Sequence, residues 1–314
     1  MRESDLFNIG KCMATKITHR GPDAGDVWLD RQSGLVLAHR RLSIIDLAGG
    51  AQPMVSSSGR YVLTYNGELY NYRELRRELA SRGSTFRDAS DTEVLLEALT
   101  HWPVDKALSK LVGMFAFALW DREERRLILG RDRMGEKPLY YGWVGNSFVF
   151  ASEPRAFDEH PGWQRKIDLD SLALFFRHNY VPDPHSIFQG IYKLPPSSYL
   201  ALDYEALNRR PDNFSPFAVD DRVSRFAPTA YWSPHQIPMS VPNTRLTQSE
   251  AIAELKQLLR GTIKDKLVAD VPIGALLSGG IDSSLVTALM QEASSSVVET
   301  FSIGFESETH NEAK

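Results

Sequence analysis

The chain has 314 residues, enough for two domains that each bury a core of their own. Apolar residues make up 42% and charged residues 24%, as in globular proteins, and with a net charge of −4 and no long basic run we expect no nucleic-acid partner. No apolar run approaches the ~20 residues that span a bilayer, and the first ten residues lack a signal-peptide core, so we expect no membrane partner and a cytoplasmic location.

The first two thirds of the chain predict a strand-rich domain with a few helices. Helical spacing of apolar residues predicts an N-terminal helix over residues 5–17. In the segment GMFAFALW, large and small residues alternate, which predicts a strand between two layers, with the small side chains allowing close approach. Because the connections are short, we expect antiparallel sheets with packed helices. Strands are expected at residues 35–38, 61–65, 113–120, 126–130 and 147–151, and helices at residues 72–81 and 91–101.

The composition of the sequence changes at residues 207–243, where six prolines occur and the apolar residues show little periodicity. Proline removes backbone donors, so this segment is predicted to be an extended linker. After it, Thr247 and Glu250 form a capping box at the start of an amphipathic helix. A buried strand at residues 271–277, a helix at 284–292 and a second strand at 297–303 then predict the start of a parallel nucleotide-binding sheet.

The segment SGGIDSS connects this first strand to its helix. Gly279 and Gly280 let the backbone approach an anion, and the helix that follows directs its positive end toward it. Asp282 can hold a magnesium ion that bridges phosphates. Because no Gly-Lys-Ser/Thr follows the glycines, the loop suits pyrophosphate as a leaving group. The structural alternative is a glycine turn with a serine helix cap, which the flanking strand and helix disfavour.

Preceded by VPIGALL and followed by TFSIGF, this loop resembles the synthetase domain of glutamine-hydrolysing asparagine synthetases. The resemblance implies a carbon–nitrogen ligase that uses ATP and Mg²⁺, with aspartate as the carboxylate acceptor of the amide nitrogen. It also implies that Leu277 and Ile303 flank the adenosine. Pyrophosphate and magnesium would be held by Ser278, Gly279, Gly280, Asp282, Ser283 and Ser284.

Six further motifs occur in the order found in class II glutamine amidotransferase domains of the N-terminal-nucleophile type. They are HRGPD, HRRLSIID, YNGELYN, SDTE, GMFAFALWD and RDRMGEKPLYY. The resemblance implies an αββα sandwich of the α+β class at residues 1–205 and a linker at 206–243. At residues 244–314 it implies the start of an α/β parallel sheet like that of the adenine-nucleotide α-hydrolases.

Glutamine is a zwitterion, so its site needs a guanidinium for the carboxylate and a carboxylate for the amine, and Arg41 and Asp91 match those positions. Amide hydrolysis also builds an oxyanion, for which Asn66 and Gly67 would supply donors. The alternative is that Arg41 and Asp91 are surface charges and that Asn66-Gly67 is a hairpin turn. The remaining residues implied to line the pocket are Leu42, Ser43, Ile44, Ile45 and Glu68.

The chain departs from the family at the nucleophile, which is a cysteine at the mature N-terminus. This chain begins MRES, and its single cysteine, Cys12, falls inside the first predicted helix, where we expect a buried apolar residue. We therefore expect no glutamine hydrolysis by this chain. It also stops before the residues that bind the acceptor, so we expect it to be incomplete at both ends.

Three functional alternatives follow from these observations. A β-lactam-forming synthetase on the same scaffold is disfavoured, since a discarded pocket has no reason to keep Arg41, Asn66, Gly67 and Asp91. An amidotransferase of cell-surface sugar synthesis stays open, because the insertion at residues 208–224 is longer than expected for asparagine synthetases. A glutamine-binding remnant without catalysis is the third. The resemblance also implies a possible homodimer.

Overall fold

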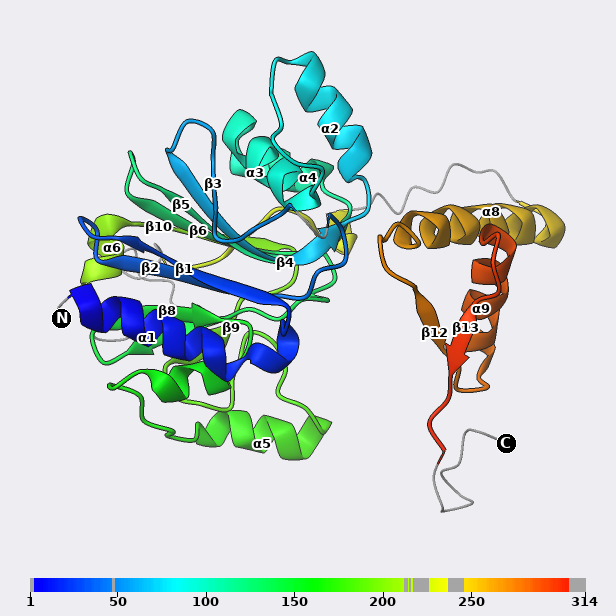
Figure 1. Cartoon of the computed structure of the whole chain (residues 1–314). Helices are drawn as coiled ribbons and strands as arrows, with labels where there is room; N and C mark the ends of the chain where they lie inside the picture. The colour runs from blue at the N-terminus through cyan, green and yellow to red at the C-terminus, as the bar shows by residue number, and fades with distance from the viewer. Residues whose placement is uncertain are drawn as a thin grey trace. The chain divides into compact units, whose positions relative to one another are not determined.

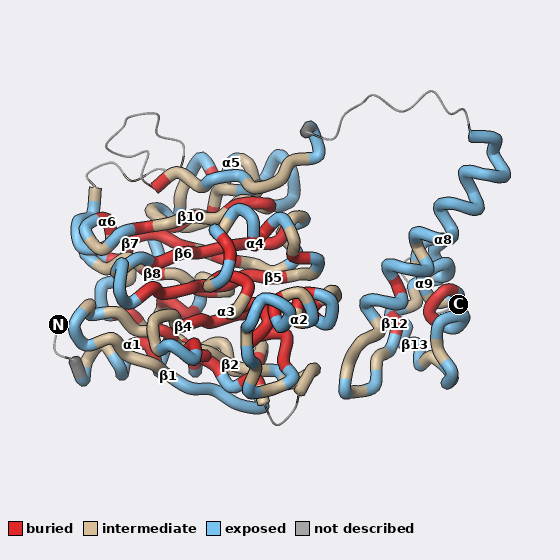
Figure 2. The backbone as a smooth tube through the Cα atoms, turned by 90° about the horizontal axis from the view of Figure 1, so that it is seen from above, coloured by how far each residue is buried: buried red, intermediate tan, exposed pale blue. Residues whose placement is uncertain are grey.

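The computed structural model describes residues 3–46, 49–211, 214, 216, 226–236 and 246–304. The chain divides into two compact units, Met1–Ile237 and Pro238–Lys314, which are described separately (Figure 1). Figure 2 shows that many of the buried residues of the first unit lie in its strands, and α3 (Asp91–His101) is the helix with the most buried residues. The three-part domain boundaries at residues 205 and 243 stay a prediction.

The larger sheet of the first unit is antiparallel, and its strands occur in the order β11-β10-β6-β5-β4-β3. The strands predicted at residues 61–65, 113–120 and 126–130 all lie in it, which confirms those predictions. The strands are β3 (Met54–Val55), β4 (Tyr61–Leu69), β5 (Gly113–Asp121), β6 (Arg126–Arg131), β10 (Ser198–Asp203) and β11 (Thr229–Ala230).

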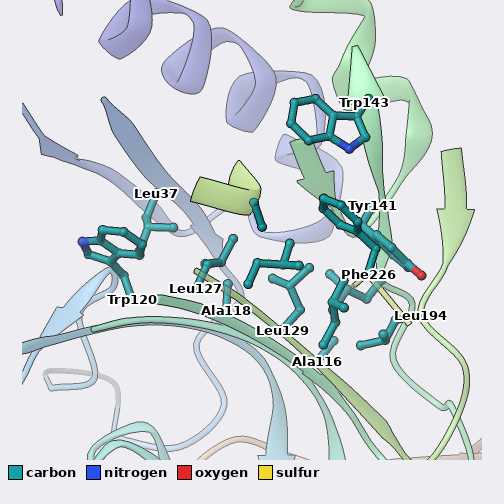
Figure 3. Packing of buried hydrophobic residues seen from close by; sticks show 14 of the residues in the cluster. Leu37, Ala116, Ala118, Trp120, Leu127, Leu129, Tyr141, Trp143, Leu194 and Phe226 are labelled. Atoms are coloured by element: carbon teal, nitrogen blue, oxygen red, sulfur yellow. The ribbon is translucent and has the colours of Figure 1, made fainter. Parts of the chain in front are cut away.

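Two smaller sheets form the second layer. One pairs β1 (Ala24–Asp30) with β2 (Leu35–Arg41), and the other has the order β8-β7-β9, with β7 at Tyr140–Val144, β8 at Ser147–Ala151 and β9 at Ile191–Lys193. An apolar core lies between the layers and joins Leu37 of β2, Ala116 and Ala118 of β5, and Tyr141 and Trp143 of β7 (Figure 3). The two alanines face this core, as the alternation in GMFAFALW predicted.

Helices cover the outer faces of both layers. The helix α3 (Asp91–His101) packs on β4, with α2 (Tyr72–Ser81) and α4 (Val104–Lys110) against it, whereas α1 (Glu3–Lys16) packs on β1 and β2 (Figure 1). The order helix, sheet, sheet, helix confirms the predicted αββα sandwich. The other helical segments of the first unit are η1 (Thr18–Arg20), η2 (Pro154–Glu159), α5 (Leu169–His178), α6 (Tyr204–Asn208) and η3 (Pro234–Gln236).

Two expectations for the first unit differ from the structure. Cys12 is exposed on α1 rather than buried, because it lies outside the apolar stripe that Ile9 and Met13 turn inward. Part of the proline-rich segment also packs onto this unit: Phe226 is only 2% exposed within the core, and β11 extends the larger sheet.

In the second unit, α8 (Gln248–Lys266) starts with the predicted capping box, in which Thr247 and Glu250 bond each other's backbone groups. The strand β12 (Gly274–Leu276) then leads to α9 (Ile281–Ala293) and the parallel strand β13 (Glu299–Phe301), which confirms the predicted strand, helix, strand order. The prediction of a buried strand at residues 271–277 was wrong, because β12 is shorter and only Ala275 is buried. Among the described residues the sheet has two strands, too few to bury both faces.

In the part of the chain that the structure describes, no helix combines the length and apolar character needed to cross a bilayer.

Candidate glutamine and nucleotide sites

The loop that follows β2 is held by polar contacts at both ends. Arg41, the last residue of β2, donates from Nη2 to the carbonyl oxygens of Ile45 (3.2 Å) and Asp46 (2.7 Å). The backbone N–H of Ser43 donates to the Asp23 carboxylate at 2.8 Å. The HRGPD motif therefore supports the loop of residues 42–45, with its aspartate as the anchor, while Leu42 is 55% exposed at the loop surface.

Asn66 and Gly67 lie in the middle of β4, paired with Ala116 and Phe115 of β5, so the hairpin-turn alternative is wrong. The Nδ2 atom of Asn66 is buried and has no hydrogen-bond partner among the described residues. A side-chain amide left without a partner is costly unless a ligand or water bonds it. A Cβ atom at Gly67 would lie 2.3 Å from the Met114 carbonyl oxygen, so the sheet itself requires glycine there.

Asp91 is the first residue of α3 and is buried, so the surface-charge alternative is wrong for it. Its Oδ2 accepts hydrogen bonds from the Tyr65 hydroxyl at 2.8 Å and the Leu69 backbone N–H at 3.0 Å, which attaches the start of α3 to β4. Burial raises the pKa of the Asp91 carboxyl above its ordinary value, and the hydrogen bonds from Leu69 and Tyr65 oppose that rise.

Gly50 lies between Arg41 and Ser90, the residue that precedes Asp91. A Cβ atom there would lie 2.9 Å from Nη2 of Arg41 and 3.1 Å from Cβ of Ser90, the residue before Asp91. Gly50 also has a positive φ of 67° and donates its N–H to the Asp88 carboxylate at 2.9 Å. The structure therefore brings Arg41 and the start of α3 together around Gly50, and attaches Asp91 to β4 at Tyr65 and Leu69, the residues that flank Asn66–Glu68 in the strand. Gly50 was not among the predicted site residues; the Gly-Gly pair at residues 49–50 was the available signal.

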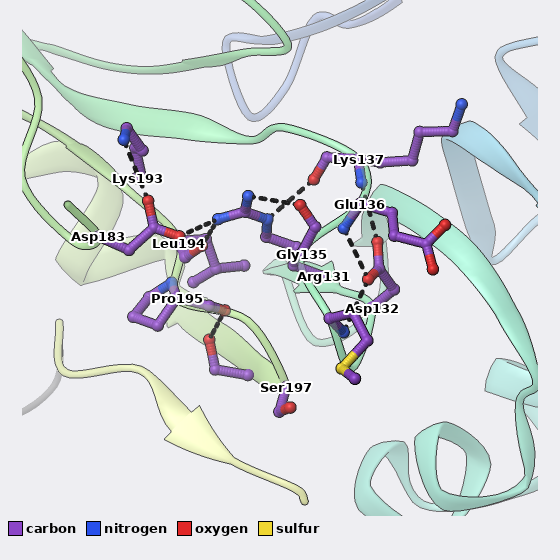
Figure 4. A network of polar contacts seen from close by, with 12 residues as sticks. Arg131, Asp132, Gly135, Glu136, Lys137, Asp183, Lys193, Leu194, Pro195 and Ser197 are labelled. Carbon is purple, nitrogen blue, oxygen red and sulfur yellow. Dashed lines mark hydrogen bonds and ion pairs between the residues drawn. The ribbon is translucent and has the colours of Figure 1, made fainter. Parts of the chain in front are cut away.

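The RDRMGEKPLYY motif forms a supporting network (Figure 4). The Asp132 carboxylate accepts hydrogen bonds from four backbone N–H groups, those of Phe115, Met134, Glu136 and Lys137. Buried Arg131 donates to the carbonyl oxygens of Gly135, Lys137 and Leu194 and pairs with Asp183 at 3.0 Å. These contacts fix the turn that enters β7, so both side chains have a structural role.

In the second unit the SGGIDSS segment covers the turn that follows β12 and the first turn of α9, which starts at Ile281, three residues before the predicted start at residue 284. Gly279 has a φ of 80°, which favours glycine, and Gly280 is the N-cap of α9. The hydroxyls of Ser278 and Ser283 lie 3.0 Å apart, and the loop is exposed. Hydroxyls and N–H groups at a helix N-terminus fit an anion.

The remaining predicted nucleotide residues flank this loop. Leu277 donates its N–H to the carbonyl oxygen of Phe301 at 2.9 Å, and Ile303 follows β13 with 65% of its surface exposed. Asp282 lies in the first turn of α9. No group of three or more metal-binding side chains occurs among the described residues. A single carboxylate still fits Mg²⁺, which keeps most of its ligands as waters and phosphate oxygens.

Residues 2–213 match the family model of the glutamine amidotransferase domain. The chain belongs to this family. Residues 254–314 of this glutamine amidotransferase-domain protein match a second model, that of asparagine synthase. The resemblance predicted from the motifs is therefore confirmed in both units.

Curated relatives carry the same combination. The chain is 34% identical over 303 residues to asparagine synthetase (glutamine-hydrolyzing) 3 of Bacillus subtilis, covering 94% of this chain and 45% of that protein. It is 33% identical over 314 residues to a putative asparagine synthetase (glutamine-hydrolyzing) 2 of Methanocaldococcus jannaschii, covering 94% of this chain and 56% of that protein. The chain thus spans about half the length of these relatives.

Among solved structures, the glutamine phosphoribosylpyrophosphate amidotransferase from B. subtilis, complexed with ADP and GMP, is similar with a TM-score of 0.48 and 18% identity. That match covers 96% of this chain and 65% of the other.

Proposed function

We propose that the chain takes part in the ATP-dependent amidation of aspartate to asparagine with glutamine as the nitrogen donor. The observation that supports the proposal is the buried Nδ2 of Asn66, which has no hydrogen-bond partner among the described residues, in the strand to which the carboxylate of Asp91 is attached; the guanidinium of Arg41 lies near the start of the same helix. The names of the curated relatives support the same reaction.

In the proposed glutamine complex, Arg41 binds the α-carboxylate and Asp91 binds the α-ammonium. The side-chain amide then lies toward β4, where Asn66 Nδ2 and the Gly67 N–H donate to the carbonyl oxygen and to the oxyanion that it becomes. The peptide groups of Leu42, Ser43, Ile44, Ile45 and Glu68 line the same pocket. Arg41 keeps its loop contacts through Nη2, which leaves the rest of its fork of donors for the ligand.

In the proposed nucleotide complex, the loop from Ser278 to Ser284 binds the pyrophosphate part of ATP and Asp282 holds Mg²⁺. Ser278, Gly279, Gly280, Ser283 and Ser284 supply hydroxyl and N–H donors, and Leu277 and Ile303 pack against the adenosine. When bound, ATP supplies the activation of the acceptor carboxylate. Aspartate as acceptor, a homodimeric assembly and a cytoplasmic location belong to this proposal.

The proposal is tested by two truncated analogues of glutamine, titrated into the wild-type chain and two variants. Glutaramate lacks the amine and 4-aminobutanamide lacks the carboxylate. We expect the wild-type chain to prefer L-glutamine over both by about tenfold or more, since each analogue leaves one buried or half-buried charge unpaired.

Each variant should lose discrimination against one analogue only. Arg41→Ala should bind 4-aminobutanamide and glutamine equally, and Asp91→Asn should bind glutaramate and glutamine equally. If both variants discriminate as the wild type does, the two residues do not bind the zwitterion and the proposed site is wrong.

A further inference from the structure

The two charged groups proposed to bind glutamine come from different layers of the sandwich. Arg41 ends β2, in the two-stranded sheet of the second layer, whereas Asp91 starts α3, which packs on β4 of the larger sheet. An α-amino acid carries its carboxylate and its ammonium group on one carbon, so a site for both must hold its guanidinium and its carboxylate at a fixed separation. That separation depends on the contacts that connect the end of β2 to the start of α3.

Asp46 makes such a connection with both its backbone and its side chain. Its carbonyl oxygen accepts a hydrogen bond from Nη2 of Arg41 at 2.7 Å. Its carboxylate accepts one at Oδ2 from the N–H of Ala89 at 2.8 Å, and Ala89 lies two residues before Asp91 in the chain. One residue thus bonds the guanidinium directly and also holds the segment that enters α3.

A second carboxylate, that of Asp88, makes the reciprocal contact. It accepts hydrogen bonds at Oδ2 from the N–H of Gly50 at 2.9 Å, and at Oδ1 from the N–H of Ser90 at 2.9 Å and its hydroxyl at 2.7 Å. Burial tends to raise the pKa of Asp88, but the hydrogen bonds from Gly50 and Ser90, together with the charge of Arg87, lower it below its ordinary value. These contacts therefore favour the ionised carboxylate.

Asp88 is itself fixed by two helices. Its N–H donates to the Glu93 carboxylate of α3 at 3.0 Å, and its carbonyl oxygen accepts a hydrogen bond from Nη1 of Arg76 of α2 at 2.6 Å. A Cβ atom at Gly49 would lie 2.2 Å from Oδ2 of Asp46 and 2.8 Å from Cβ of Asp88. A side chain at position 49 would therefore displace one of the two aspartates, which pack against the same glycine.

The backbone of Asp46 has a conformation that favours glycine. Its φ is 51°, in the left-handed region. The side chain at this position accepts two hydrogen bonds, from the N–H of Gly49 to Oδ1 at 2.9 Å and from the N–H of Ala89 to Oδ2 at 2.8 Å. Backbone outliers that the surrounding contacts hold in place are concentrated at functional sites. The conformation therefore directs attention to what the Asp46 carboxylate does.

We propose that Asp46 is a positioning residue of the glutamine site, whose carboxylate couples the guanidinium of Arg41 to the start of α3. It thereby fixes the separation at which the site accepts both charges of an α-amino acid. The inference rests on the proposed function, since it concerns the same site. Without this carboxylate, Arg41 and Asp91 are both still present but their separation is no longer held, so a ligand with a single charge loses little.

The variant Asp46→Asn tests this with L-glutamine and the two single-charge analogues. An amide has one oxygen, so only one of the two N–H groups keeps an acceptor and the other faces an NH₂ group. We expect L-glutamine to bind about tenfold more weakly than to the wild type, and glutaramate and 4-aminobutanamide to change by less than about threefold. A general loss of structure would weaken all three ligands alike. Equal losses for the three ligands, or no loss for glutamine, would overturn the inference.

A second variant and a matched control accompany it. Asp46→Gly removes the carboxylate and relieves the positive φ, so backbone strain cannot explain its effect, and it should show the same selective loss. The control is Asp30→Asn. The Asp30 carboxylate also bonds two turn N–H groups and Nε1 of Trp120, but it lies at the opposite end of the β1–β2 pair from Arg41. Binding of the three ligands should be unchanged in this control, and a selective loss there would count against a specific role of Asp46.

Amide hydrogen exchange, measured residue by residue without ligand, separates this inference from the proposed function. The N–H groups of Gly50 and Ser90 bond Asp88 rather than Asp46. Their exchange should rise by about tenfold in Asp46→Asn, because the two carboxylates hold the segments together as one unit. Unchanged exchange at both residues would overturn the inference even if glutamine binds as proposed. Raised exchange in a chain whose wild type binds no glutamine would contradict the proposed function and support the coupling.

Discussion

At the residue scale, two neighbouring positions of β4 bear on the proposed glutamine site. Asn66 lies in a regular strand, yet its Nδ2 is buried without a partner among the described residues, a state that a bound carbonyl oxygen would relieve. The sheet requires glycine at position 67, since a Cβ atom there would lie 2.3 Å from the Met114 carbonyl oxygen of β5. In the proposed glutamine complex the N–H of the same residue donates to the oxyanion.

The raised pKa of Asp91 predicts how glutamine binding depends on pH. Its carboxylate must be ionised to bind an ammonium group, and burial raises its pKa above the usual range of aspartate. As the solution is acidified, glutamine affinity should therefore begin to fall at a higher pH than it would if Asp91 had the pKa of an ordinary aspartate. The protein is still folded at that pH. Titrations at a series of pH values would show this, and a fall absent from the wild type or retained in Asp91→Asn would contradict the assignment.

His39 predicts an acid sensitivity of the fold itself. Its pKa is lowered to about 4 in the folded chain from an ordinary value of 6.5. The folded state thus binds the proton less tightly than the unfolded state, and the stability present above pH 6.5 is lost as the pH falls toward 4. Between pH 7 and pH 5 this amounts to about 2 kcal/mol. Denaturant unfolding at both pH values should show that the free energy of unfolding falls between pH 7 and pH 5 by about 2 kcal/mol less in His39→Gln than in the wild type. An equal fall in the two chains would refute the prediction.

At the scale of elements, the start of α3 combines a helix cap at Ser90 with the attachment of Asp91 to β4. Ser90 is buried, accepts the Glu93 N–H at 3.2 Å and donates to Asp88 at 2.7 Å, while the next residue, Asp91, is attached to β4. The start of α3 is therefore fixed by three contacts: Ser90 with the Glu93 N–H, Ser90 with Asp88, and Asp91 with β4. Its positive end also favours the ionised form of the carboxylate that it presents.

Removing that cap should affect stability and binding together. Ser90→Ala should lower the free energy of unfolding by about 1 kcal/mol and weaken glutamine binding, because the first turn that positions Asp91 loosens. Thr247→Ala is the matched control, since it removes the cap of α8 in the second unit. It should lower stability by a similar amount with unchanged glutamine affinity. Chemical denaturation and calorimetry of both variants would check this, and equal effects on affinity would argue against a local role for Ser90.

Elements with strong local signals were predictable from the sequence. The bounds of α2 and α3 agree with the predicted residues 72–81 and 91–101, because each has a helical apolar period and α3 also has a serine cap. Asn66-Gly67 resembles a hairpin turn locally, and only the pairing with β5 makes it a strand. The prediction that Cys12 is buried was wrong because neighbouring residues of a helix point about 100° apart, so Cys12 is exposed although the next residue, Met13, faces inward. The contact of Gly50 with Arg41 depends on a loop path that no local pattern specifies.

At the scale of the whole molecule, the two units differ in how much apolar surface they bury. The first has a continuous core between its sheets, whereas in the second Leu276 is 77%, Ile281 88% and Val297 86% exposed. Since burial of apolar surface is the main stabilising contribution, the second unit should unfold first.

Ligands should therefore act on separate unfolding transitions. Scanning calorimetry of the chain should resolve two, with L-glutamine raising the temperature of the later one and ATP with Mg²⁺ that of the earlier one. A ligand at about 100 times its Kd stabilises its unit by about 2.7 kcal/mol, enough to shift a transition by several degrees. A single transition that both ligands shift would contradict separate units.

The most direct test of the glutamine site is an isothermal titration of the 314-residue chain with L-glutamine, run beside Arg41→Ala. The wild type should bind one glutamine per chain, and removal of the guanidinium should weaken binding by about tenfold or more. Glutamate release should be absent, because the single cysteine, Cys12, is exposed on α1 and does not line the cavity that contains Asn66. No binding by the wild type, or equal binding by the two chains, would contradict the proposed site.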